Sequence, residues 1–258
     1  MTERYATFHD LEGASVFITG GGAGIGAALT EGFVAQGAKV AFVQRSDAAD
    51  FAASIEERHG ARPLFISCDV TDIPALRAAM EQAAEAHGPI TVLVNNAAND
   101  TRHAWDEVDV EYWDKTQAVN LRPHFFTAQA AAPGMKAAGG GSIINFSSVS
   151  YMMGQGGYAG YVSAKAGITG LTRGLARDFG PDRIRVNAIM PGWVLTERQM
   201  ELWATPKGLA NHLERQCLKE HLVERDIVDS VLYLASKTSR MVTSQALVVD
   251  GGTVMSGG

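Results

Sequence analysis

Short apolar runs alternate with longer amphipathic segments along nearly all of this chain of 258 residues. The apolar runs have the length and composition of buried strands, and they lie at residues 16–19, 39–43, 63–67, 91–94, 142–146, 184–189 and 246–249. Strands that alternate with helices predict a parallel sheet, because parallel strands need a long crossover connection. The sequence therefore predicts an α/β fold, a doubly wound and mainly seven-stranded parallel sheet with helices on both faces.

The segments between these runs predict helices, at residues 25–36, 48–59, 73–87, 110–138, 161–179 and 225–236. No repeat, charge block or linker divides the chain, so we expect a single domain over residues 1–258. The stretch 196–220 has no strand-like run and is rich in Arg, Gln, Trp and Met. It follows a late strand, so it predicts a substrate lid. The alternative is a solvated helical excursion without substrate contact.

A glycine-rich turn, GGGAGIG, follows the first predicted strand and opens the first predicted helix. Gly20 permits a tight turn, Gly24 lets the backbone approach a pyrophosphate, and Gly26 allows close packing of helix on strand. The phosphates would lie at the helix N-terminus, where unpaired N–H groups favour anions. The turn predicts a dinucleotide site in a Rossmann-like domain. A flexible turn without a ligand is the alternative.

Tyr161 and Lys165 are four residues apart in a predicted helix, so their side chains share one helix face. A free tyrosine has a pKa of about 10 and is a poor base at neutral pH. A nearby ammonium favours the phenolate and would lower that pKa. Such a pair can take a proton from an alcohol or give one to a carbonyl, which is half of a hydride-transfer reaction.

Composition excludes several other classes of function. The net charge of −6 argues against nucleic acid as a partner, and no apolar run is long enough for a membrane span. The opening segment MTERYATFHDLEG lacks the apolar core of a signal peptide. Cys68 and Cys217 lie far apart without a CxxC motif, which suits a reducing compartment and no structural metal. We therefore expect a cytoplasmic protein.

Several motifs occur in one order along the chain, namely TGGGAGIG at 19–26, CDV at 68–70, NNAA at 95–98, AVN at 118–120, IINFSSVS at 143–150 and PGWVLT at 191–196. Together with the pair Tyr161 and Lys165 they resemble the short-chain dehydrogenase/reductase family over essentially the whole chain. The chain departs from the family pattern at Ala98, where glycine is usual.

The resemblance implies a catalytic tetrad of Asn120, Ser148, Tyr161 and Lys165. The serine thirteen residues before the tyrosine is Ser148, which would hydrogen-bond the substrate oxygen and stabilise developing charge. Tyr161 would be the base in oxidation and the acid in reduction. Lys165 would lower the pKa of Tyr161 and hold the nicotinamide ribose, and Asn120 would order a proton-relay water.

The resemblance also implies the cofactor contacts, which are Gly20, Gly24, Ile25, Gly26, Gln44, Arg45, Asp69, Val70, Asn96, Ala97, Tyr161, Lys165, Pro191, Gly192, Val194 and Thr196. Asp69 would accept from the adenine amino group. Gln44 is neutral where NAD-binding chains usually carry a carboxylate, and Arg45 could pair with a 2′-phosphate. The sequence favours NADP. NAD stays open, because Arg45 could instead stack on adenine and Asp47 could bind the ribose.

A finer resemblance, carried by NNAANDTRH at 95–103 and by the segment that follows it, is to the aldose dehydrogenases of this family. These enzymes oxidise the anomeric hydroxyl of a pentose, hexose or 6-deoxyhexose to a lactone. The candidate substrate residues are Asn99, Arg102, His103, Ser148, Ser150, Gln155, Tyr161, Trp193, Arg198 and Gln199. Arg102 and His103 could instead tie their loop to the long helix or to a subunit contact.

Two rival functions stay open at this point. One is an NADPH-dependent reductase of a ketone or 3-oxoacyl group, and the other is a dinucleotide-sensing protein without turnover. Intact Ser148 and Tyr161 argue against the second rival, because cofactor binding alone needs neither side chain. The resemblance further implies a homotetramer in which the predicted helices 110–138 and 161–179 form one interface.

Overall fold

All seven predicted strands are present and form one parallel sheet. In this computed structural model, which describes residues 5–254, the strands are β1 (Ser15–Thr19), β2 (Lys39–Gln44), β3 (Leu64–Ser67), β4 (Val92–Asn95), β5 (Gly141–Phe146), β6 (Ile184–Pro191) and β7 (Ala246–Val249). Their order is β3-β2-β1-β4-β5-β6-β7, and every neighbouring pair is parallel. The strand order reverses between β1 and β4, which is where doubly wound sheets bind ligands. The predicted fold class is confirmed.

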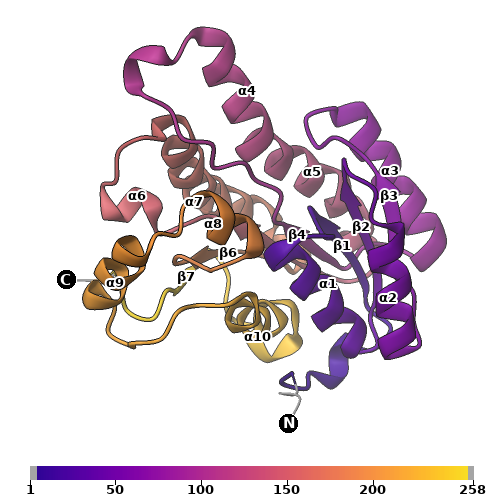
Figure 1. Cartoon of the computed structure of the whole chain (residues 1–258). Helices are drawn as coiled ribbons and strands as arrows, with labels where there is room; N and C mark the ends of the chain where they lie inside the picture. The colour runs from indigo at the N-terminus through magenta and orange to yellow at the C-terminus, as the bar shows by residue number, and fades with distance from the viewer. Residues whose placement is uncertain (1–4, 255–258) are drawn as a thin grey trace.

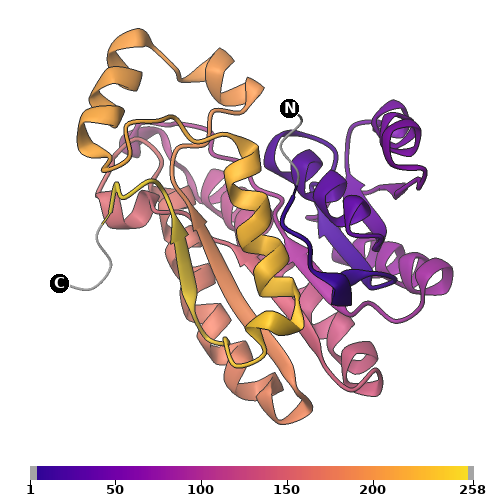
Figure 2. The ribbon, with the colours of Figure 1, turned by 90° about the horizontal axis from the view of Figure 1, so that it is seen from below.

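Two layers of helices cover the sheet (Figures 1 and 2). The helices are α1 (Gly24–Ala35), α2 (Ala49–His59), α3 (Ile73–His87), α4 (Val110–Asn120), α5 (Arg122–Ala137), α6 (Ser150–Met153), α7 (Ala159–Phe179), α8 (Glu197–Leu202), α9 (Pro206–Arg215) and α10 (Glu224–Ala235). One core cluster joins the sheet to α1, α2 and α10, and Phe33 and Val231 are fully buried in it. The other joins the sheet to α3, α5 and α7 around Met135. Burial of such side chains contributes about 1.5–3 kcal/mol each.

The predicted single helix 110–138 is wrong, because the chain breaks at Leu121 between α4 and α5. Pro123 lies in the first turn of α5. A proline inside a continuous helix would lose a backbone hydrogen bond and clash with the carbonyl four residues earlier. Asn120 is fully buried beside the break. Its Oδ1 accepts from the N–H of Asn99 at 2.8 Å, and its Nδ2 donates to the carbonyl of Asn99 at 3.1 Å. The side chain of Asn120, next to this break, thus holds the loop that follows β4 in place.

The segment 196–220 contains α8 and α9, which lie beyond the carboxyl ends of β6 and β7 (Figure 1). Thr196 caps α8 by accepting from the N–H of Gln199, and Thr205 caps α9 by accepting from that of Gly208. The short α6 is missing from the predicted elements, because four residues are too few to show a helical period. Helix α7 begins at Ala159, two residues before the predicted start.

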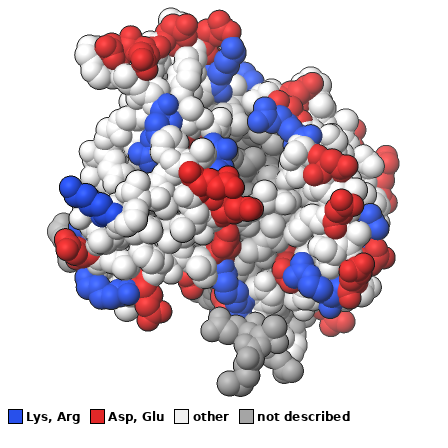
Figure 3. All heavy atoms as spheres, in the orientation of Figure 1, with Lys and Arg blue, Asp and Glu red and all other residues white. Residues whose placement is uncertain are grey.

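The surface carries charges of both signs. Figure 3 shows acidic and basic side chains interspersed on one face, with acidic ones gathered over α4 and the loop before it. Within residues 5–254, no helix is both long enough and apolar enough to span a bilayer.

Candidate active site

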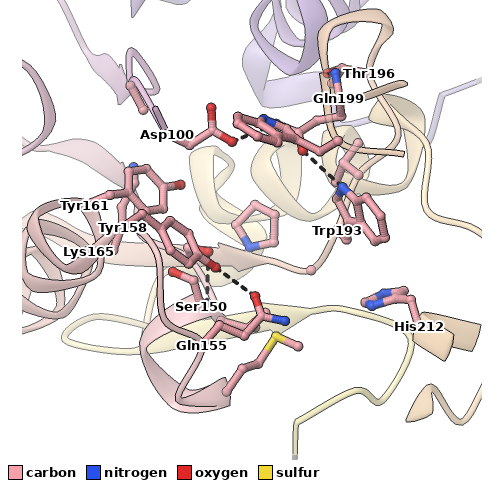
Figure 4. A pocket seen from close by; sticks show the side chains of 18 of the residues that line it. Asp100, Ser150, Gln155, Tyr158, Tyr161, Lys165, Trp193, Thr196, Gln199 and His212 are labelled. Atoms are coloured by element: carbon pink, nitrogen blue, oxygen red, sulfur yellow. Dashed lines mark hydrogen bonds between the residues drawn. The ribbon is translucent and has the colours of Figure 1, made fainter. Parts of the chain in front are cut away.

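A cavity of about 660 Å³ lies beyond the carboxyl ends of β4, β5 and β6, beneath α8 and α9. Figure 4 shows side chains from the loop after β4, from α7 and from the segment 196–220 facing the same space. The residues of its wall that the sequence analysis names are Ile25, Asn96, Arg102, Ser148, Ser150, Gln155, Tyr161, Lys165, Pro191, Gly192, Trp193, Val194, Thr196 and Gln199. The fold therefore brings together most of the candidates for catalysis and for substrate binding.

Four of the candidates for catalysis or substrate binding are not among the residues that line this cavity. The side chain of Asn120 is hydrogen-bonded to the backbone of Asn99, as described above. The Asn99 side chain accepts from the N–H and the hydroxyl of Thr101, so it shapes its own loop. The His103 ring packs edge-on against Tyr112 of α4, with 5.2 Å between centroids, which favours its alternative role as a tie to that helix. The Arg198 side chain is 58% exposed.

Tyr161 and Lys165 both project from α7 toward the end of β5 (Figure 4). The Nζ atom of Lys165 lies 5.4 Å from the centroid of the Tyr161 ring and donates to the carbonyl of Phe146 at 2.7 Å. Ser148 hydrogen-bonds Tyr161. The hydroxyl of Ser147 donates to the carbonyl of Lys165 at 2.7 Å instead. The geometry therefore places Ser148, and not Ser147, at the reactive hydroxyl of Tyr161.

The electrostatics of this pair differ from the sequence-based expectation. Burial, followed by the negative charge of Asp100, raises the pKa of Tyr161, and the hydrogen bond from Ser148 opposes the rise. Burial lowers the pKa of Lys165 to about 7, against a smaller opposing effect of Asp100. The expected lowering of the tyrosine pKa is wrong, because burial of the phenol outweighs the groups that favour its ionised form. Both groups are held toward their neutral forms.

Asp100 belongs to the cavity wall and to the polar stretch 99–103 that follows β4, although it is not among the substrate residues predicted from the sequence. Gln199 of α8 donates from Nε2 to Oδ2 of Asp100 at 2.8 Å, and Trp193 donates from Nε1 to Oε1 of Gln199 at 3.0 Å. This chain of hydrogen bonds joins the loop after β4 to the segment 196–220. The available signal was the position of Asp100 directly after β4, where parallel sheets place ligand-binding side chains.

Further wall residues are Tyr158, Asn211, His212 and Arg215, which no sequence motif indicated, and Trp203, which the sequence places within the predicted lid. Tyr158 stacks on Tyr161 with 5.6 Å between ring centroids and 12° between ring planes. The His212 ring meets that of Trp193 edge-on at 5.4 Å. Asn211, His212 and Arg215 belong to α9, which is too far along the chain from β4 and β5 for local periodicity to relate them to the site.

The glycine turn between β1 and α1 has the conformation that a dinucleotide site requires. Gly20 and Gly24 have φ values of +69° and +50°, which side chains other than glycine rarely adopt. A Cβ atom at Gly26 would overlap the carbonyl oxygen of Gly20. The turn thus leaves the N-terminus of α1 bare, which fits the binding of a pyrophosphate there.

The predicted adenosine end lies at the carboxyl ends of β2 and β3, away from the cavity wall. Gln44 accepts from the N–H of Gly22 at 3.1 Å, so it braces the glycine turn. Arg45 is 78% exposed and lies 3.9 Å from Asp69. Burial alone would raise the pKa of Asp69, but hydrogen bonds from Thr71 and the charge of Arg45 hold it below its usual value. Asp69 is therefore an ionised acceptor at neutral pH.

Comparisons with known proteins bear on this geometry. A family model described as "Enoyl-(Acyl carrier protein) reductase", which represents short-chain dehydrogenases/reductases, matches residues 20–254. The "Probable galactose dehydrogenase GalD" of Rhizobium meliloti (strain 1021) is 48% identical over 254 residues, which cover 98% of this chain and 99% of that protein. The chain belongs to the short-chain dehydrogenase/reductase family. It is an oxidoreductase that acts on CH–OH groups with NAD or NADP, as this family does.

Other short-chain dehydrogenases/reductases are similar along nearly the whole chain. The D-xylose 1-dehydrogenase of Caulobacter vibrioides (strain NA1000 / CB15N) is 45% identical over 249 residues, covering 96% of this chain and 98% of that protein. A blue fluorescent protein from a metagenomic library, solved in complex with NADPH, has a TM-score of 0.87 and 34% identity, covering 95% of this chain and 100% of that one. A mutant of a Serratia marcescens short-chain dehydrogenase/reductase has the same TM-score and identity, covering 95% and 99%. The predicted resemblance to this family is confirmed.

Proposed function

We propose that this protein oxidises the anomeric hydroxyl of an aldose, a pentose, hexose or 6-deoxyhexose, to the lactone, with transfer of a hydride to NAD(P). The observation that carries the proposal is the similarity over almost the full length to two proteins named as sugar dehydrogenases. The cavity supports it, because Asp100, Gln155 and Asn211 offer the many hydrogen-bonding groups that a sugar needs.

Tyr161 would take the proton of the anomeric hydroxyl while Ser148 donates a hydrogen bond to the same oxygen. When bound, the nicotinamide supplies the acceptor for the hydride that leaves the anomeric carbon. The carbon–oxygen bond then becomes a carbonyl next to the ring oxygen, which gives a lactone. Ser148 suits its role because its hydroxyl donates to Tyr161 and because its Oγ accepts from the N–H of Ser150 at 3.1 Å, which orients the hydroxyl.

Lys165 and Asn120 would complete the catalytic tetrad from behind Tyr161. Burial holds the pKa of Lys165 at about 7, so Nζ can both accept and release a proton near neutral pH. That property suits passing on the proton from Tyr161 as well as holding the nicotinamide ribose. Asn120 would order a relay water, and its hydrogen bonds to Asn99 would fix the loop that carries Asp100 and Arg102.

We further infer a preference for NADP over NAD. Gly20, Gly24 and Gly26 would hold the pyrophosphate, and Asp69 would accept from the adenine amino group. Gln44 brings no negative charge to the end of β2, and the exposed guanidinium of Arg45 is available to a 2′-phosphate. Such a pair is a charge-assisted hydrogen bond, which is about twice as strong as a neutral one.

We also propose a cytoplasmic homotetramer with α4, α5 and α7 in one interface. Trp113 and Phe125 are each 40% exposed on α4 and α5, and Val110 is 77% exposed. On α7, a Cβ atom added at Gly170 or Gly174 would meet no described atom within 4 Å, so a partner helix could approach closely. Light scattering should give four subunits for the wild type and fewer for Trp113→Asp; a wild-type monomer would contradict the proposal.

A substrate panel run with both cofactors tests the function. The purified protein is assayed by cofactor absorbance with D-xylose, D-galactose, L-arabinose, L-fucose and L-rhamnose, and in reverse with a 3-oxoacyl thioester. We expect reduction of the cofactor with at least one aldose and formation of an acidic product as the lactone hydrolyses. Turnover of the thioester without turnover of any aldose would overturn the proposal.

A further inference from the structure

Asp100 is a carboxylate enclosed in the wall of the cavity. Its side chain is only 19% exposed, although it belongs to a loop whose next residues, Thr101 and Arg102, are exposed. In Figure 4 its carboxylate faces the space that Tyr161 and Trp193 also face. An ionised carboxylate loses hydration when it is enclosed, so it requires hydrogen-bond donors in compensation.

The hydrogen bonds in the structure use only part of the acceptor capacity of Asp100. Gln199 donates to Oδ2 at 2.8 Å. The guanidinium of Arg198 lies 3.8 Å from Oδ1, which is longer than a hydrogen bond. An ionised carboxylate offers about four lone-pair sites. The side chain can therefore accept further hydrogen bonds from a molecule in the cavity.

The surroundings hold this carboxylate near the reacting atoms and in a fixed orientation. The charge of Asp100 acts on Tyr158, Tyr161 and Lys165, so the carboxylate lies within electrostatic reach of the proton-transfer groups. Gln199 is itself fixed by the indole N–H of Trp193 at 3.0 Å. A fixed and partly satisfied acceptor beside the reaction site is suited to a hydroxyl group on a ring carbon of a bound sugar.

We propose that Asp100 is a specificity-determining residue that accepts a hydrogen bond from one ring hydroxyl of the aldose other than the anomeric one. This proposal rests on the proposed function. It goes beyond that function because it assigns the recognition of one sugar hydroxyl to a carboxylate that also accepts a hydrogen bond from Gln199 of the segment 196–220. A purely structural role, in which Asp100 only holds Gln199 and the lid, would affect every sugar equally.

Deoxy sugars separate these two roles. The ratio of kcat/KM for the best aldose to kcat/KM for each singly deoxygenated analogue is measured in the wild type and in Asp100→Ala. A hydrogen bond to a charged group contributes about 1.5–3 kcal/mol, so one analogue should be about 10- to 100-fold poorer in the wild type. In Asp100→Ala we expect that single ratio to fall to about one while the other ratios stay unchanged.

Two further variants serve as controls. Gln199→Ala removes the lid contact but keeps the carboxylate, so the penalty for the same analogue should persist. Asp106→Asn neutralises an exposed carboxylate of the same loop outside the cavity wall and should change no ratio. If Asp100→Ala turns over too slowly to assay, calorimetric binding of the same sugars to the wild type and to Asp100→Ala, both loaded with reduced cofactor so that no hydride is transferred, gives the ratios as Kd values, and the same single ratio should fall to about one.

The outcomes also separate this inference from the proposed function. If the wild type oxidises an aldose and the variant keeps every deoxy-sugar ratio, the assignment of Asp100 is wrong while the function stands. If the wild type oxidises no aldose, the proposed function itself is wrong. A uniform loss across all sugars in both Asp100→Ala and Gln199→Ala would show that Asp100 acts only through the lid.

Discussion

The guanidinium of Arg102 lies over the ring of Tyr158, with 4.1 Å between its Cζ atom and the ring centroid. The same Cζ lies 5.0 Å from the centroid of the ring of Trp203, the residue that follows α8. Tyr158 in turn stacks on Tyr161. One stack of side chains therefore connects the segment 196–220, the loop after β4 and the proposed catalytic base. A displacement of α8 should therefore shift the ring of Tyr161 through these contacts.

Arg102→Met should loosen the packing of α8 against the loop after β4, because methionine keeps an apolar stem but loses the cation. Exposed cation–π contacts contribute about 0.5–1 kcal/mol each, so we expect KM for the sugar to rise by a factor of about 2 to 5. Amide hydrogen exchange in residues 197–203 should become faster. Arg173→Met, at an exposed position of α7, is the control and should change neither quantity. Unaltered exchange in Arg102→Met would mean that the stack does not hold α8 in place.

This stack shows where prediction from sequence reaches its limit. The strands could be predicted because a buried parallel strand leaves a short apolar run, and the glycine turn because only glycine adopts its backbone angles. The break at Leu121 was signalled by Pro123, a local cue that the long helical pattern obscured. The contacts among Arg102, Tyr158 and Trp203 depend on how distant segments pack, and no periodicity encodes that.

The pKa shifts of Tyr161 and Lys165 could not be predicted from the sequence for a related reason. The spacing of Tyr161 and Lys165 correctly placed both residues on one face of a helix. It could not indicate that Nζ is directed to the carbonyl of Phe146, because that carbonyl belongs to the end of another element, β5. The pKa of a buried group depends on such neighbours and on desolvation. The direction in which each pKa shifts could therefore be found only from the folded chain.

Tyr161→Phe should abolish most turnover while leaving cofactor binding nearly intact. General acid–base catalysis contributes about 10²- to 10⁴-fold, and we expect kcat to fall within or beyond that range. Cofactor fluorescence should give a Kd within a few fold of the wild type. Tyr158→Phe is the matched control, because it keeps the stacked ring and removes only the hydrogen bond to Gln155. That variant should lose less than about tenfold, and an equal loss in both variants would contradict the assigned roles.

Replacing Gln44 with Asp and Arg45 with Ala should move the cofactor preference toward NAD. The new carboxylate would repel a 2′-phosphate and could accept from the ribose hydroxyls, while the loss of Arg45 removes a cation. We expect the ratio of kcat/KM for NADP to that for NAD to fall by at least about tenfold, since charged hydrogen bonds contribute about 1.5–3 kcal/mol. Arg62→Ala, at an exposed position before β3, is the control. A ratio that stays constant would show that these two residues do not select the cofactor.

His124 should make the fold less stable in mild acid. Its side chain is 1% exposed on α5, and burial, followed by the charge of Lys165, lowers its pKa to about 3. In the unfolded chain the pKa is about 6.5. Between these values the unfolded state binds the proton and the folded state does not, so the free energy of unfolding falls as the pH falls below about 6.5.

The size of this effect can be measured with His124→Leu, which removes the titrating group. From pH 7 to pH 5 the wild type should lose about 2 kcal/mol more of its free energy of unfolding than the variant does. Urea unfolding at a series of pH values supplies both curves. His9→Leu, the same substitution at an exposed histidine, is the matched control. If His124→Leu and the wild type lose stability in parallel, the acid sensitivity comes from other groups, and the folded state can accept a proton at His124 without this cost.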